Sequence, residues 1–282
     1  MVKRVGFIGL GDMGEPMARN LCGGDFDVMV YDLREDILKD FTELGARVGE
    51  SAQEVGEHAE VVGICVINDA GTLAVAKQVF SGAAPGTIVA VHGTVSPECI
   101  EELVKLAGEC GCHVVDAQVT GGRPRASERQ LRYMVGAEDE VFARCRPVFE
   151  TSAAEITHCG PVGMGAIAKL CNNLVQFQAW QGYVEADMLA EKAGLSREKL
   201  FEVLSWIMND NARVFLAGRG ALVQNPENEM IRERFSSAKE LAAKDLKLAA
   251  ELGRKHGIEL SVTEFGAEHL ARLFGLGDSQ DD

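Results

Sequence analysis

The sequence predicts an α/β fold, with a doubly wound N-terminal domain and an all-α C-terminal domain joined by a long helix. Two observations carry this prediction. Short apolar runs alternate with helical patterns up to about residue 160, as expected of parallel strands that are covered on both faces. After Gly160-Pro161 the pattern is helical, with no convincing strand. We therefore expect domains at 1–160 and 161–282.

The individual elements follow from the length and polarity of each run. Strands are expected at Val5–Gly9, Asp27–Tyr31, Val61–Val66, Thr87–Val91, His113–Val119 and Leu131–Val135. The helices between them include Glu15–Cys22, Asp36–Leu44 and Ser96–Gly111. In the second half, one uninterrupted helical pattern from Met164 to Ala193 is followed by Arg197–Met208, Ala238–His256 and Val262–Phe274.

The first strand runs directly into Gly9, Gly11 and Gly14, which form a G-x-G-x-x-G motif between a strand and a helix. Gly9 permits the tight turn, Gly11 lets the backbone approach a pyrophosphate, and Gly14 lets the helix pack against the strand. The helix N-terminus supplies N–H groups for the phosphates. The second strand ends on Asp32, where a carboxylate accepts ribose hydroxyls. The motif predicts a Rossmann domain that binds a dinucleotide.

The cofactor is expected to be NAD, with NADP possible. A carboxylate at Asp32 repels a 2′-phosphate, which favours NAD. Arg34 follows two residues later and is able to reach such a phosphate.

Composition narrows the partners and the compartment. A formal net charge of −15 argues against nucleic acid or an anionic membrane surface as a partner. The eight Cys lack metal-ligand spacing, so no metal is expected and the chain is interpreted as reduced and cytoplasmic. Because the first predicted strand starts close to Val2, no signal peptide is expected, and no apolar run approaches membrane-spanning length.

A second informative segment runs from Gly163 to Asn173. On a helix, Lys169 and Asn173 are four residues apart and share a face. Polar side chains within an apolar helix need partners, and the small residues Gly163 and Gly165 let a ligand or another backbone come close. A lysine that pairs with a carboxylate across an interface is the structural alternative. A functional lysine is favoured because this helix starts where the nucleotide domain ends.

Three further segments contain polar groups. Thr120-Gly121-Gly122 follows a strand and either forms a concave anion site or is an ordinary turn. Thr94 is better placed to contact cofactor than His92, for which a structural role is favoured; Ser96-Pro97 is a helix start. Lys244-Asp245, taken alone, is interpreted as a solvated pair on a helix.

In order, the segments G-L-G-D-M-G, G-T-V-S-P, D-A-Q-V-T-G-G, G-M-G-A-I-A-K-L-C-N-N and K-D-L resemble the β-hydroxyacid dehydrogenase family. This 6-phosphogluconate dehydrogenase-like family includes 3-hydroxyisobutyrate dehydrogenase, tartronate semialdehyde reductase and glyoxylate/succinic semialdehyde reductases. The resemblance implies that Lys169 is catalytic, with Asn173, Thr120, Gly121 and Gly122 on the substrate. It places the cofactor on Gly9, Leu10, Gly11, Asp12, Met13, Gly14, Asp32, Val66, Ile67, Asn68, Thr94 and Lys244.

The resemblance implies an NAD(P)-dependent oxidoreductase that transfers a hydride between a nicotinamide and a small anionic β-hydroxyacid or its semialdehyde. Lys169 would be the general acid–base, which requires a pKa well below the ordinary value of about 10.4. Two alternatives are an imine reductase on the same scaffold and a non-catalytic dinucleotide-binding protein. Imine reductases commonly replace this lysine, so Lys169 disfavours the first alternative. The intact Lys169/Asn173 pair disfavours the second.

The chain departs from the family pattern after the Gly pair. Gln118 and Thr120 stand where the family usually has Pro and Ser. Arginines replace the small residues of the following loop, at Arg123, Arg125, Arg129 and Arg132. We expect Arg123 and Arg125 to select a second negative charge on the substrate. The alternatives are a displaced partner acid and arginines that face solvent beside surface acids.

A homodimer or homotetramer is also expected. The helical half contains large apolar residues that look exposed in the sequence pattern, namely Trp180, Tyr183, Phe201 and Trp206. The family associates through this domain.

Overall fold

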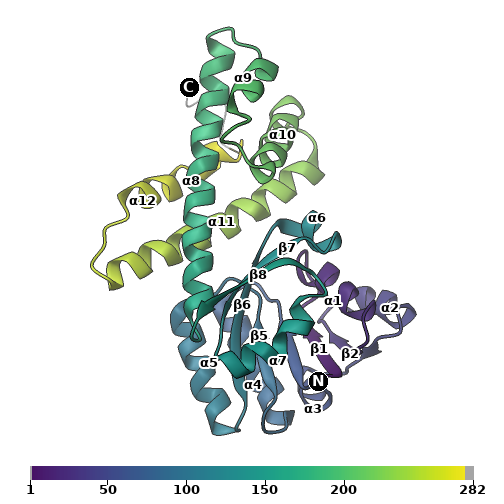
Figure 1. Cartoon of the computed structure of the whole chain (residues 1–282). Helices are drawn as coiled ribbons and strands as arrows, with labels where there is room; N and C mark the ends of the chain where they lie inside the picture. The colour runs from purple at the N-terminus through teal and green to yellow at the C-terminus, as the bar shows by residue number, and fades with distance from the viewer. Residues whose placement is uncertain (1, 277–282) are drawn as a thin grey trace. The chain divides into compact units, whose positions relative to one another are not determined.

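The computed structural model describes residues 2–276, and the chain divides into two compact units, Met1–Lys169 and Leu170–Asp282. The first unit is built on one eight-stranded sheet with the order β3-β2-β1-β4-β5-β6-β7-β8. Figure 1 shows this sheet and labels most of its strands. Its strands are β1 (Arg4–Ile8), β2 (Asp27–Tyr31), β3 (Arg47–Val48), β4 (Val61–Ile64), β5 (Ile88–Val91), β6 (His113–Thr120), β7 (Leu131–Gly136) and β8 (Ala153–Gly160). The predicted doubly wound α/β domain is confirmed.

Helices connect the strands of this unit. They are α1 (Gly14–Cys22), α2 (Glu35–Glu43), α3 (Ala52–His58), α4 (Asp69–Gly82), α5 (Pro97–Glu109), α6 (Gly122–Ser127) and α7 (Asp139–Phe149). The start of α5 is as predicted: the Ser96 hydroxyl accepts from the Cys99 N–H, and Pro97 is the first helical residue.

Two strands were not predicted. β3 has only two residues, too few for any periodicity, and β8 is interrupted by polar residues. The sheet is also not wholly parallel, because β6 and β7 pair antiparallel. β7 and β8 extend the sheet beyond the six parallel strands, β8 running parallel to β7.

The register of the sheet brings the strand ends together. Ile8 at the end of β1 pairs with Tyr31 of β2 and with Ile64 of β4. Ile64 pairs with Val91 of β5, and Val91 pairs with Asp116 of β6. The segments that leave β1, β2, β4 and β5 therefore start side by side at one edge, the carboxyl edge where such folds bind ligands.

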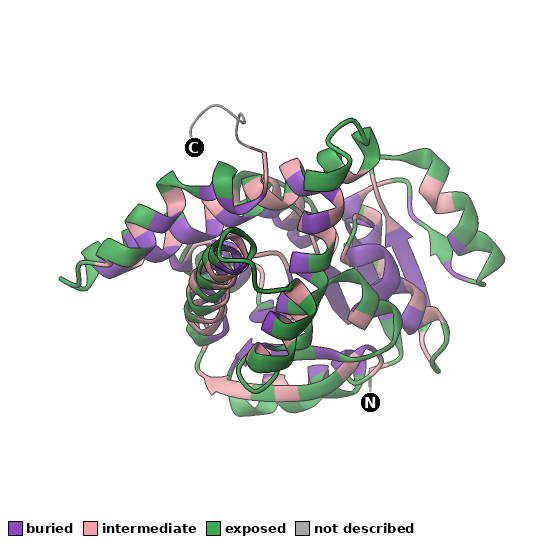
Figure 2. Ribbon diagram, turned by 90° about the horizontal axis from the view of Figure 1, so that it is seen from above, coloured by how far each residue is buried: buried purple, intermediate pink, exposed green. Residues whose placement is uncertain are grey.

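Both faces of the sheet are covered. Alternate residues along the strands belong to two separate apolar clusters, as Val28 and Val30 do in one cluster and Met29 in the other. Figure 2 shows the strands at the centre of this unit as buried. A sheet packed on both faces gives the edge that carries the loops a rigid support.

The second unit is helical, and its described residues, 170–276, contain no strand. Helix α8 (Met164–Lys192) begins in the first unit and runs into the second. The others are α9 (Arg197–Leu204), α10 (Asp210–Gln224), α11 (Glu229–Lys255), α12 (Ser261–Glu268) and α13 (Leu270–Leu273). Helix α10 and the first turns of α11 were missed; two glycines interrupt the pattern of α10.

Aromatic rings form the core of the second unit. Trp180 stacks on Phe215 with ring centroids 4.2 Å apart, and Phe274 packs edge-on against Phe215. The expectation that Trp180, Tyr183 and Phe201 are exposed is therefore wrong, because all three are partly buried against this core. Trp206 is 95% exposed, as expected.

Across residues 2–276, no helix combines the length and the apolar character needed to cross a membrane.

Candidate active site

The glycine loop has the geometry that its motif requires. Gly9 has a φ of +91°, which favours glycine. A Cβ on Gly14 would lie 1.9 Å from the Gly9 carbonyl oxygen, so a side chain there would force helix α1 off the loop. A Cβ on Gly11 would have no described atom within 4 Å. The loop therefore leaves room for a ligand over Gly11 while α1 begins directly behind it.

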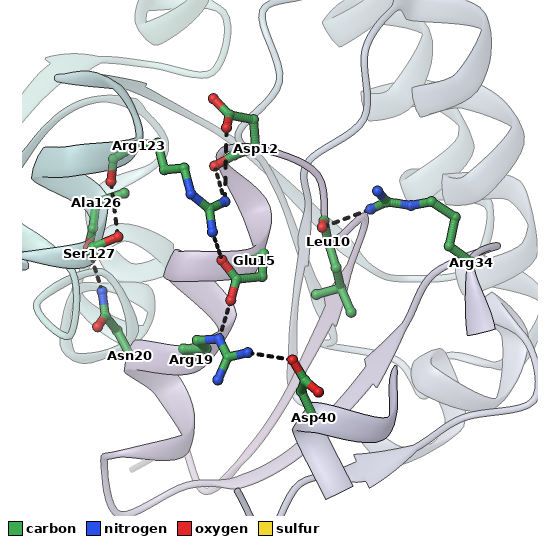
Figure 3. Close-up of polar contacts among 10 residues, drawn as sticks. All are labelled: Leu10, Asp12, Glu15, Arg19, Asn20, Arg34, Asp40, Arg123, Ala126 and Ser127. Atoms are coloured by element: carbon green, nitrogen blue, oxygen red, sulfur yellow. Dashed lines mark hydrogen bonds and ion pairs between the residues drawn. The ribbon is translucent and has the colours of Figure 1, made fainter. Parts of the chain in front are cut away.

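Asp32 is held at the end of β2 by hydrogen bonds from Leu10 and Arg34. The Leu10 N–H donates to Oδ2 at 2.6 Å, and the backbone N–H and Nε of Arg34 donate to Oδ1 at 2.9 and 3.1 Å. Burial alone would raise the pKa of Asp32, but the hydrogen bonds from Arg34 and Leu10 hold it below its ordinary value. Arg34 Nη2 also donates to the Leu10 carbonyl (Figure 3). The carboxylate is fixed beside the glycine loop.

Two further predicted segments leave the same edge. Val66, Ile67 and Asn68 follow β4, where Ile67 is 74% exposed and the Asn68 side chain accepts from the Gly71 N–H at 2.9 Å. Asn68 thus caps α4 and holds this loop in shape. Thr94 follows β5 and is half-buried. Within the first unit, the register places these segments on the edge that carries the glycine loop.

Asp116 anchors the start of helix α8. It is fully buried on β6, and its two carboxylate oxygens accept from the N–H groups of Gly163 and Ala166 at 2.8 and 2.7 Å. These are N–H groups that the first turn of a helix leaves unpaired. Burial raises the pKa of Asp116 to about 6, while the two hydrogen bonds act in the opposite direction. A Cβ on Gly165 would lie 2.4 Å from the Asp116 carbonyl oxygen, so only glycine lets α8 approach this closely.

Lys169 lies in the second turn of α8, three residues beyond the anchored Ala166, and is half-buried. Thr120 is the last residue of β6, and Gly121 and Gly122 follow it with φ of +132° and +73°. The stem of Arg125 lies against Gly121, whose Cβ would be 3.1 Å from Arg125 Cδ. The Thr120–Gly122 turn is thus a specialised one, with two residues in the region that favours glycine.

Asn173 is one turn beyond Lys169 on α8 and is buried within the second unit. Its Nδ2 donates to Asp245 Oδ2 at 2.6 Å, and its Oδ1 accepts from Asn172 Nδ2 at 3.0 Å. Asp245 is only 6% exposed, and Lys244 Nζ lies 3.4 Å from its Oδ1. The interpretation of Lys244-Asp245 as a solvated pair is wrong, because Asp245 is a buried group that fixes the Asn173 amide.

His92 belongs to the core of the first unit. Its ring stacks on Phe7 at 5.6 Å and packs edge-on against Tyr133 and Phe149. Nδ1 lies 2.9 Å from the Ala117 carbonyl oxygen, and burial lowers the pKa of His92 to about 4. A neutral imidazole enclosed by aromatic rings is structural, in line with the preferred interpretation of the sequence.

The four arginines of the loop have different surroundings. Arg123 Nη2 donates to Glu15 Oε2 at 2.6 Å, and its Nη1 donates to the Asp12 carbonyl at 3.1 Å (Figure 3). Arg132 lies on the surface beside Glu155, with Nε and Oε2 3.3 Å apart. Arg129 has a φ of +59°, and its Nη2 is 2.9 Å from the position that a Cβ on Gly23 would occupy. The loop is not one cluster of cations.

Sequence reasoning gave no role to three of the residues that shape these sites. Asp116 was a polar residue within a strand, and the signal that could have found it is a carboxylate within an otherwise apolar run. Asp245 and Glu15 lie on helices, where a charge ordinarily faces solvent. In residues 2–276 no group of three His, Cys, Asp or Glu side chains is arranged to hold a metal ion.

Two family models together match most of the chain. Residues 4–160 match the NAD-binding domain of 6-phosphogluconate dehydrogenase, and residues 163–282 match a domain described as NAD-binding of NADP-dependent 3-hydroxyisobutyrate dehydrogenase.

Named relatives cover nearly the full length. A probable 3-hydroxyisobutyrate dehydrogenase of Mycobacterium tuberculosis is 34% identical over 95% of this chain and 92% of its own. The 2-(hydroxymethyl)glutarate dehydrogenase of Eubacterium barkeri is 31% identical over 97% and 91%. The solved structure of Mycobacterium tuberculosis 3-hydroxyisobutyrate dehydrogenase with L-serine matches with a TM-score of 0.82 at 31% identity, covering 96% of this chain and 94% of that one. Solved imine reductases match at 14–18% identity, which bears on the fold alone.

Proposed function

The chain belongs to the β-hydroxyacid dehydrogenase family and is an NAD(P)-dependent oxidoreductase of small hydroxyacids, and from this premise we propose how its residues act. Lys169 is the general acid–base. The observation that carries this assignment is the pair of hydrogen bonds from Gly163 and Ala166 to Asp116. These bonds fix the start of α8 on strand β6, and therefore also fix the backbone of Lys169 one turn later.

The cofactor-binding role falls to the residues at the carboxyl edge of the sheet. The open space over Gly11 and the close packing of Gly14 on Gly9 fit a pyrophosphate cradle. Leu10, Asp12 and Met13 complete that loop, Asp32 receives the ribose, and Val66–Asn68 and Thr94 face the nicotinamide side. Lys244 is a further cofactor-binding residue. The dinucleotide, when bound, supplies or accepts the hydride.

Lys169 moves the proton that accompanies the hydride. During oxidation its neutral amine removes the proton from the substrate hydroxyl, and during reduction its ammonium returns a proton to the carbonyl oxygen. Asn173 orients that oxygen through its amide. An amide nitrogen carries two hydrogens, and Asp245 accepts one of them, which fixes the direction in which the group donates.

Thr120, Gly121 and Gly122 hold the substrate carboxylate with one hydroxyl and backbone N–H groups. Arg125 binds a second negative charge in this proposal, which is supported by the packing of its stem against Gly121. The Eubacterium barkeri relative is named for a dicarboxylate substrate, which supports a dianionic substrate class here. Arg123 is engaged by Glu15 and Asp12, so the part expected of it in substrate selection passes to Arg125.

NAD is the preferred dinucleotide. The Asp32 carboxylate stays ionised because hydrogen bonds lower its pKa, and a fixed negative charge repels a 2′-phosphate. Arg34 is paired with this carboxylate, which reduces the positive charge that it presents to a phosphate. The cytoplasm is the proposed compartment, supported by eight free thiols.

Steady-state turnover of a panel of substrates with NAD and NADP tests this assignment. The panel contains 3-hydroxyisobutyrate, the dianion 2-(hydroxymethyl)glutarate and a cyclic imine. Hydroxyacid oxidation with a preference for NAD is the expected result. Turnover of the imine alone would support an imine reductase. NADH binding without any turnover would support a non-catalytic binding protein.

A further inference from the structure

The loop that follows the substrate-binding turn is tied to the loop that holds the cofactor phosphates. Arg123 lies one residue after Gly122, yet its guanidinium reaches helix α1, where it contacts Glu15 and the carbonyl oxygen of Asp12 (Figure 3). Asp12 is inside the glycine motif, and Glu15 is the residue directly after it. One side chain therefore joins two loops that lie more than a hundred residues apart in the sequence.

Glu15 places a negative charge next to the site proposed for the negatively charged pyrophosphate. It lies in the first turn of α1, whose N-terminus is the phosphate end of the Rossmann motif, and it is only 7% exposed. A carboxylate with so little solvent is poorly screened. Its Oε1 is bonded by Arg19 from the same helix, and Arg19 Nη2 also donates to Asp40 at 3.0 Å. Glu15 is therefore balanced by two cations, Arg19 and Arg123, and Arg19 is also shared with Asp40, so Arg123 carries part of the compensation.

A second contact holds the two elements together without Arg123. Asn20 of α1 donates from Nδ2 to the Ala126 carbonyl oxygen of α6 at 2.8 Å, and this bond is buried. The docking of α6 on α1 therefore does not depend on the guanidinium. Removal of Arg123 should leave the backbone in place and change mainly the local charge.

We propose that Arg123 is a positioning residue for the dinucleotide, acting by neutralising Glu15 and by holding the Asp12 carbonyl beside the phosphate site. This inference rests on the proposed function for the identity of the cofactor and extends it to a residue outside the glycine motif. When Arg123 is lost, Glu15 keeps only Arg19, which is shared with Asp40, and its partly compensated carboxylate lies in the helical turn that meets the two negative charges of a pyrophosphate. Repulsion across the first helical turn then weakens NADH binding by about tenfold.

The test compares NADH dissociation constants from fluorescence titration. Arg123→Ala should bind NADH about tenfold more weakly. Arg123→Lys, which keeps the charge, should retain most of the affinity. In the double variant Glu15→Gln/Arg123→Ala the offending charge is gone, so binding should return to within about threefold of the unmodified protein. Arg132→Ala is the matched control, since it removes an arginine of the same stretch that pairs only at the surface.

Two results would overturn the proposal: unchanged NADH affinity in Arg123→Ala, or a double variant that binds as weakly as the single one. Thermal unfolding of each variant shows whether a loss of affinity reflects a loss of fold. The double variant also lacks Arg123, so recovery of its NADH affinity would show that the fold survives without this arginine. The readout is binding, so a protein that binds NADH but oxidises no hydroxyacid would contradict the proposed function and leave this comparison valid.

Discussion

At the scale of single residues, the preference for NAD over NADP is expected to depend on Asp32 and on the groups that hold its carboxylate. The motif places a carboxylate at the end of β2, and the hydrogen bonds from Leu10 and Arg34 keep it ionised and still. We expect NAD to bind more tightly than NADP, and Asp32→Ser to narrow the difference because it removes the negative charge. Dissociation constants for both cofactors measure this, and tighter binding of NADP by the unmodified protein would contradict it.

His92 gives a pH dependence to stability. Its pKa is about 4 in the folded chain against about 6.5 when unfolded, because burial disfavours the charged ring. Above pH 6.5 the ring is mostly neutral in both the folded and the unfolded chain, so it does not change the free energy of unfolding there. As the pH falls from 6.5 to 4, the unfolded chain takes up the proton first, and the free energy of unfolding falls by roughly 3 kcal/mol.

Asp116 acts in the opposite sense. Its folded pKa of about 6 exceeds the unfolded value of 3.8, so the folded chain gains a proton first over nearly the same interval.

Urea unfolding of His92→Gln isolates the histidine contribution, and the variant should lose less stability than the unmodified protein between pH 6.5 and 4. An identical slope for the two proteins would show that His92 titrates as an exposed ring.

The positions of individual residues were predictable where the signal is local. The G-x-G-x-x-G spacing and Asp32 lie within one β-α-β stretch, so their positions follow from the sequence. The partners of Asp116, Glu15 and Arg123 come from elements far along the chain. No periodicity records such a contact, so these pairings appear only in the structure.

At the scale of elements, helix α8 depends on a close approach at its start. Gly165→Ala would place a methyl group 2.4 Å from the Asp116 carbonyl oxygen, which forces the helix away from the sheet. We expect destabilisation of about 1–3 kcal/mol and a fall in kcat, since Lys169 moves with the helix. Chemical unfolding and steady-state kinetics measure both.

Gly182 is the matched control on the same helix. A Cβ there meets no described atom within 4 Å, so Gly182→Ala should stabilise α8 by about 0.5–1 kcal/mol through its higher helix propensity. Equal effects of the two substitutions would mean that the close approach at Gly165 does not matter.

The helices and strands were predicted best where the hydrophobic pattern is regular and uninterrupted. The apolar strands β1, β2, β4 and β5 and the helix α8 follow from their patterns. Strand β3 is too short, β8 too polar, and α10 is interrupted by Gly218 and Gly220, so tertiary packing and not local preference decides them.

At the scale of the whole molecule, we predict that exposed apolar side chains mediate self-association. Val203, Trp206 and Ile207 are 73%, 95% and 70% exposed at and just after the end of α9. Such a group of large side chains is unusual on a monomer. Light scattering should give at least twice the chain mass of 30.4 kDa, and Trp206→Glu should lower it. A mass near 30 kDa for the unmodified protein at micromolar concentration would refute this.

Catalytic activity is the other property of the whole molecule, and we propose that it depends on proton transfer by Lys169. The most direct test is kcat for hydroxyacid oxidation by Lys169→Ala, beside Lys192→Ala at the end of the same helix and the NADH dissociation constant of each. We predict that kcat falls by about 10²–10⁴-fold only in Lys169→Ala, with NADH affinity within about twofold of normal because the glycine loop is untouched. A Lys169→Ala protein with near-normal kcat would contradict the account.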